Sequence, residues 1–107
     1  MKKLPYVIVA GFLAGVTIAS AATEHAITQK GRKFSESEIS IKNGDTLVFV
    51  NDDTVAHNIY STSANNEFNL GSQAPGSSTS VTFDKAGEID IICAIHPVMK
   101  MKVSVVD

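Results

Sequence analysis

The sequence has one cysteine, no internal repeat, no low-complexity segment and no tract rich in methionine or histidine. Small exported domains commonly pair their cysteines, and an unpaired thiol is a liability unless it is buried, catalytic or bound to a metal. No basic stripe is present, which disfavours nucleic-acid binding. No stretch keeps a 3.6-residue hydrophobic period, which disfavours amphipathic helices. The surroundings of Cys93 therefore become the main question.

The first 22 residues have the pattern of an export signal. Lys2 and Lys3 form a basic head, residues 4–18 are apolar apart from one threonine, and small residues follow at 19–22. This pattern predicts a cleavable signal peptide over residues 1–21, with an uncleaved anchor as the alternative because the apolar run is nearly long enough to span a bilayer.

Cleavage of that signal leaves residues 22–107, enough for one domain with a modest core. We expect this domain in the periplasm, without stable membrane insertion. Loss of the two signal lysines leaves seven basic and eleven acidic residues, a mild acidity spread along the chain.

Short runs of β-branched and aromatic residues, separated by turn residues, predict an all-β fold. Asn43-Gly44 and Pro75-Gly76 are turn signals. The segment from Ser61 to Ser80 is left unassigned apart from a short strand near Phe68. The predicted strands cover 39–42, 46–50, 57–61, 80–83, 88–93 and 101–106, and the predicted core includes Phe34, Phe49 and Phe83. So many short strands indicate a Greek-key β-sandwich or small barrel.

Three metal-binding side chains lie within one short loop, at Cys93, His96 and Met99, directly between two predicted strands. Thiolate and thioether are soft ligands, and two histidines with one cysteine and a weak axial methionine define blue-copper sites. His57 is the candidate for the second histidine, because it follows a strand and a turn-rich segment. Met101 remains an alternative to Met99.

The order of these residues resembles the cupredoxins, the type 1 blue-copper family, and most closely the amicyanins and plastocyanin-like proteins. The resemblance covers residues 26–106 and rests on Cys93-x-x-His96-Pro97-x-Met99, Gly44-Asp45-Thr46, Phe49-x-Asn51 and His57-Asn58. It implies a Greek-key sandwich, one copper ion cycling between Cu(I) and Cu(II), and His57, Cys93, His96 and Met99 as its ligands. It also implies a monomer whose partners are a c-type cytochrome or a periplasmic dehydrogenase.

The last strand separates the two methionines within this resemblance. In these families the axial methionine lies three residues before a Lys-Val-x-Val strand start, and Lys102-Val103-Ser104-Val105 places Met99 there. Alternation then puts Met101 on the core face with Val103 and Val105.

Two residues beside the predicted ligands add further expectations. The amide of Asn58 is expected to tie the His57 segment to the Cys93 loop. Ile95 stands where the family often has proline; if its N–H points at the Cys93 sulfur, Ile95→Pro would lower the reduction potential.

His25, near the predicted mature amino terminus, is expected in a mobile segment or an edge strand, as a solvated side chain. Cleavage after Ala22 would instead place Thr23-Glu24-His25 at an amino terminus able to bind Cu(II) or Ni(II).

These observations favour a soluble one-electron carrier. Copper storage, delivery or sensing in the envelope is the alternative, using the same ligands. An enzyme built on a Cys93–His96 pair or a zinc site is disfavoured, because so small a domain has little room for a substrate pocket.

Overall fold

A computed structural model describes residues 21–107 of the chain. The predicted signal peptide lies outside these residues except for Ala21. Within the described part, no helix is long and apolar enough to cross a membrane. The strands are β1 (Glu24–Lys30), β2 (Lys33–Phe34), β3 (Glu38–Lys42), β4 (Thr46–Asn51), β5 (His57–Ser61), β6 (Phe68–Gln73), β7 (Ser78–Thr82), β8 (Gly87–Cys93) and β9 (Lys100–Val106).

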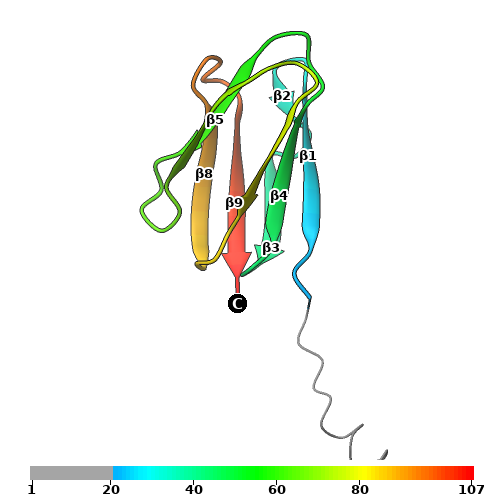
Figure 1. Cartoon of the computed structure of the whole chain (residues 1–107). Helices are drawn as coiled ribbons and strands as arrows, with labels where there is room; N and C mark the ends of the chain where they lie inside the picture. The colour runs from blue at the N-terminus through cyan, green and yellow to red at the C-terminus, as the bar shows by residue number, and fades with distance from the viewer. Residues whose placement is uncertain (1–20) are drawn as a thin grey trace, which may run out of the picture.

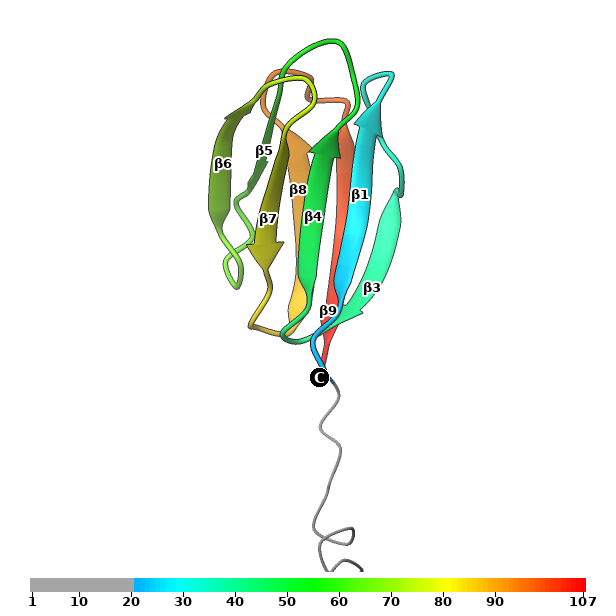
Figure 2. The same cartoon turned by 45° about the vertical axis from the view of Figure 1, so that its right-hand side comes forward.

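The strands form two sheets that face each other, as Figures 1 and 2 show. One sheet has the order β2-β1-β4-β7 and the other has the order β3-β9-β8-β5-β6. The pairs β1–β4 and β3–β9 are parallel, and the other pairs are antiparallel. Parallel neighbours cannot be joined by a tight hairpin, so the chain crosses repeatedly between the sheets. The predicted Greek-key sandwich is confirmed.

Alternating side chains build the core between the sheets. In β9, Met101, Val103 and Val105 are buried, whereas Lys100 and Lys102 are exposed and Ser104 is half-buried, which confirms the predicted core position of Met101. Phe49 and Phe83 are fully buried, and Phe34 packs against the same core. Burial of such side chains contributes roughly 1.5–3 kcal/mol each, so this two-sheet core is the main stabilising element.

Two parts of the chain are predicted only in part. The short strand expected near Phe68 is confirmed as β6, but its extension to Gln73 and the start of β7 lie in the polar segment that was left unassigned. Turn-forming and small residues hid the strand pattern there. His25 lies in β1, which pairs with β4 along its length, whereas β2 pairs only with Gln29 and Lys30. Around His25, β1 is therefore an edge strand of its sheet, which is one of the two expected alternatives. The sequence around His25 is polar, so pairing with β4 could be recognised only in the fold.

Four connections gather at one end of the sandwich. They are the β1–β2 turn and the β4–β5, β6–β7 and β8–β9 loops, all at the top of Figure 2. The β8–β9 loop, residues 94–99, carries His96 and Met99 of the predicted ligand set. We call this end the loop end.

Candidate metal centre

Cys93 is the last residue of β8, and its free thiol is fully buried. Its backbone N–H donates to the carbonyl of Met99 (3.0 Å), which closes the β8–β9 loop on itself. The Met99 N–H donates to the His96 carbonyl (2.8 Å) and makes the loop tighter. The three loop residues of the predicted set are thereby held together by the backbone.

His57 begins β5 and is also fully buried. Its Nδ1 lies 3.8 Å from Cys93 Sγ, and its Nε2 lies 3.1 Å from Asp53 Oδ2. A carboxylate only accepts hydrogen bonds, so Nε2 carries the proton and the Nδ1 lone pair faces the sulfur. At typical metal distances of about 2.3 Å to sulfur and 2.0 Å to imidazole nitrogen, two atoms 3.8 Å apart can bind the same ion.

Asp53 orients His57, and the sequence reading missed it. Its Oδ2 also accepts the backbone N–H of Arg32 at 2.8 Å, and its Oδ1 accepts that of Thr54 at 3.0 Å. The bond from Arg32, followed by those from Thr54 and His57, lowers the pKa of this carboxyl to about 2. Asp53 is therefore ionised near neutral pH and fixes the orientation of the imidazole. Its position four residues before His57 was the available signal, but turn aspartates are too common to single it out.

A layer of buried amide side chains supports the β4–β5 loop, which carries Asp53. Gln29 donates to Gln73 Oε1 at 2.7 Å, and Gln73 donates to the Phe49 carbonyl at 2.7 Å. Asn51 donates to the Gln73 carbonyl at 2.9 Å and accepts the Asp53 N–H at 3.0 Å. All three amide side chains are at most 3% exposed. Since Gln73 is also the strand partner of His57, this layer joins both sheets beneath the histidine.

His96 lies beside His57, with ring centroids 5.2 Å apart and an edge-to-face angle of 73°. Its Nε2 is buried without a hydrogen-bond partner. Buried polar atoms are almost always paired, so this imidazole has unused bonding capacity. Met99 is 2% exposed and lies outside the main core cluster, whereas Met101 belongs to that cluster.

The predicted ligands gather at the loop end, but they do not form a closed site in this structure. Among residues 21–107, no group of three or more His, Cys, Asp or Glu side chains stands in a metal-holding arrangement. The donor types nevertheless fit copper: a free buried thiol, a lone pair aimed at it, an unpartnered imidazole nitrogen and a buried thioether.

The backbone of Asn58 connects the two ligand segments, and not its side-chain amide as expected, whose Oδ1 is buried without a hydrogen-bond partner. Its carbonyl accepts the Ala94 N–H (2.8 Å), and its N–H donates to Cys93 Sγ (3.3 Å). The expectation for Ile95 changes, because the backbone donor to sulfur among the described residues is Asn58 and not Ile95. Ile95 is instead half exposed at the tip of the loop. The structure thus removes the stated reason for a lowered potential in Ile95→Pro.

His25 lies at the other end of the sandwich, near the start of β1. Its Nε2 lies 3.0 Å from Asp45 Oδ2, and the same carboxylate accepts the N–H groups of Thr23 and Lys42. The imidazole and the Thr23 N–H are thus already engaged, and Glu24 and His25 pair within the sheet. This arrangement disfavours an amino-terminal metal site and corrects the view of His25 as a solvated side chain.

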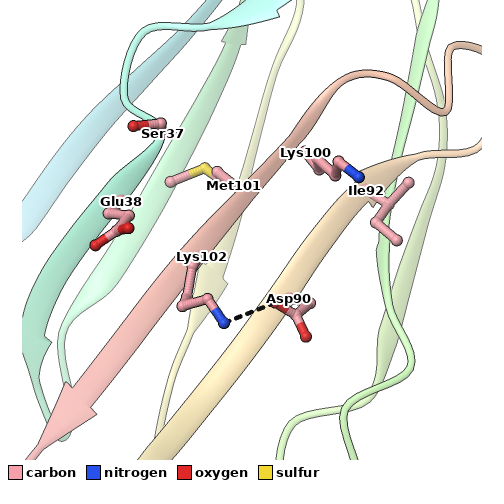
Figure 3. A pocket seen from close by; sticks show the side chains of 7 residues that line it. All are labelled: Ser37, Glu38, Asp90, Ile92, Lys100, Met101 and Lys102. Atoms are coloured by element: carbon pink, nitrogen blue, oxygen red, sulfur yellow. Dashed lines mark ion pairs between the residues drawn. The ribbon is translucent and has the colours of Figure 1, made fainter.

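A surface hollow of the described chain is separate from the predicted ligands. Figure 3 shows it on the outer face of the five-stranded sheet, over β3, β8 and β9. Its charges are partly paired, since Lys102 Nζ lies 3.5 Å from Asp90 Oδ1. It contains none of the four predicted ligands.

Comparisons with known proteins also indicate copper. The family model described as copper-binding proteins of the plastocyanin/azurin family matches residues 21–106. The methylamine utilization protein MauL of Methylorubrum extorquens is 27% identical over 98% of this chain and 93% of its own length. The amicyanin of Paracoccus versutus is 30% identical over 68% of this chain and 58% of its own.

Solved structures show the same similarity. A variant of amicyanin in its reduced Cu(I) form has a TM-score of 0.70 and 26% identity, covering 82% of this chain and 85% of that one. A purple cupredoxin from Nitrosopumilus maritimus has a TM-score of 0.67 and 27% identity, covering 75% of this chain and 97% of that one. The metal indicated by these comparisons is a single copper ion.

Proposed function

Because the chain belongs to the plastocyanin/azurin family of copper-binding proteins, we propose that it is an exported one-electron carrier whose copper is held by His57, Cys93, His96 and Met99. The observation that carries this proposal is the approach of His57 Nδ1 to the buried Cys93 sulfur at 3.8 Å. When bound, copper supplies the one-electron couple between Cu(I) and Cu(II).

The chain's own residues make that couple suitable for carrying electrons. Cys93 supplies a soft sulfur, and the Asn58 N–H, 3.3 Å away, stabilises negative charge on it. Asp53 and the amide layer hold His57 in one orientation. Ligands fixed in this way move little between oxidation states, which favours rapid transfer.

Electrons would pass at the loop end, where the surface is apolar. Val98 is 82% exposed and Ile95 51% exposed. Pro97, Ala74 and Pro75 are exposed as well and extend this apolar surface. Half-buried His96 lies within this surface. A small apolar surface suits brief redox contacts.

We further propose export to the periplasm with loss of residues 1–21, and partners of the c-type cytochrome or periplasmic dehydrogenase class. The domain would act as a monomer. The methylamine utilization named for the Methylorubrum relative is consistent with a dehydrogenase partner.

Copper loading tests the proposal. The Cu(II) protein should show an intense thiolate-to-copper absorption band and a reversible one-electron wave in voltammetry, and Cys93→Ser should abolish the band. Met99→Leu should shift the potential more than Met101→Leu, its matched control in the adjacent strand. A colourless or rapidly exchanging Cu(II) protein would contradict the carrier and favour storage or delivery. A larger shift in the Met101 variant would move the axial role to that residue.

A further inference from the structure

The charges of the described chain are separated in space, although they are spread along the sequence. Lys30, Arg32, Lys33 and Lys100 lie at the loop end together with Glu36, Asp52 and Asp53. Residues 21–107 have seven basic and eleven acidic residues, and this end takes four of the basic and three of the acidic ones. The rest of the described chain therefore has three basic and eight acidic residues. The loop end is slightly positive on a protein that is otherwise strongly negative.

Three of these cations meet the apolar loop in one hollow. Arg32, Lys33 and Lys100 line it with Val98, and Met99 forms part of its wall. Its volume is about 180 Å³, and Glu36 is its one acidic residue. All three cations are exposed, and none of them is in an ion pair within the described residues. We call Arg32, Lys33 and Lys100 the basic rim.

The turn that presents Arg32 is held in a specific shape. Gly31 and Arg32 both have positive φ, 61° and 56°, and such a φ is uncommon for a residue with a side chain. The Arg32 N–H donates to the same Asp53 oxygen that orients His57. This hydrogen bond fixes the turn against the candidate metal centre and holds the base of the basic rim in place.

We propose that the basic rim and Val98 form a docking surface for the acidic surface of a redox partner protein. This inference rests on the proposed electron transfer, because it names the partner's chemistry for the same end of the molecule. The uneven charge would turn the loop end toward a negative surface during approach, and the exposed valine would then exclude water from the contact. A protein is favoured over a lipid surface because the cations border the loop that carries Met99, where electron transfer requires close contact.

The test uses an electrode coated with a carboxylate-terminated layer as the acidic surface. Adsorption of the metal-free protein is measured by a quartz microbalance at low ionic strength, and electron exchange of the copper-loaded protein is measured by voltammetry. Lys33→Gln/Lys100→Gln removes two rim charges. Lys42→Gln/Lys85→Gln, at exposed positions away from the loop end, is the matched control with the same net charge.

We expect the wild-type protein to adsorb despite its net negative charge, and the rim variant to lose adsorption by about tenfold or more. The control should keep adsorption near the wild-type level, and salt should weaken it in the wild type. Equal losses in the two variants, or no adsorption of the wild type, would overturn the docking surface. Stronger binding to phosphatidylglycerol vesicles than to the carboxylate layer would overturn it in favour of a lipid surface. Adsorption without a voltammetric wave would leave the surface standing and reject the proposed carrier function.

Discussion

The Gln29–Gln73 pair allows a quantitative test of the buried amide layer. Gln73 is 3% exposed, accepts from Gln29 at 2.7 Å and donates to the Phe49 carbonyl at 2.7 Å. Gln73→Leu leaves the Gln29 amide and the Phe49 carbonyl without these partners. Each unsatisfied buried group costs about 1–3 kcal/mol, and burial of the apolar leucine side chain offsets part of the cost of the two groups. We therefore expect a loss of about 2–4 kcal/mol in the free energy of unfolding.

Gln29→Leu should cost less. It leaves Gln73 Oε1 without its donor, but it also removes Gln29 Oε1, which is already buried without a partner. We expect a loss of about 1 kcal/mol. In the double variant both ends of the bond are gone and only the Phe49 carbonyl remains affected, so the loss should be about 1–3 kcal/mol, below the sum of the two single losses.

Urea unfolding of the four metal-free proteins, in a double-mutant cycle, measures this coupling. We expect a coupling energy of about 1–2 kcal/mol with unchanged m-values. Single losses that add to the double loss within about 0.5 kcal/mol would refute the reasoning, because independent sites behave in that way.

Two aspartates give further predictions. The hydrogen bond with His25, followed by those from two backbone N–H groups, lowers the Asp45 pKa from 3.8 to about 2. Its contribution to stability is therefore present above about pH 4 and lost as the pH falls toward 2, so Asp45→Asn should flatten the acid limb of a stability–pH curve; an unchanged slope would contradict this. Asp53→Asn should raise the reduction potential, because a neutral amide beside His57 Nε2 makes the imidazole a weaker donor to Cu(II). Asp52→Asn removes the same charge at a residue that is 61% exposed, and voltammetry showing equal shifts in both would argue against a specific role for the Asp53–His57 bond.

Much of the fold could be predicted because its signals are local. The alternation in β9 placed Met101, Val103 and Val105 on the core face, and the structure buries all three. The alternation was less informative where a strand is polar, as in β6 beyond Phe68 and in β1. Those strands are recognised by their neighbours, and a single sequence does not contain that pairing.

The sequence by itself determined the donor types and their grouping. Cys93, His96 and Met99 lie within seven consecutive residues, so any turn between β8 and β9 keeps them close. Only the tertiary structure decided what holds and surrounds them. Asp53 lies 21 positions from Arg32, and Gln73 lies 44 positions from Gln29. Such contacts depend on strands brought together from distant parts of the chain. Local sequence patterns do not show which distant segments pair. The basic rim has the same origin, because Arg32 and Lys100 become neighbours only when β2 and β9 meet at one end of the sandwich.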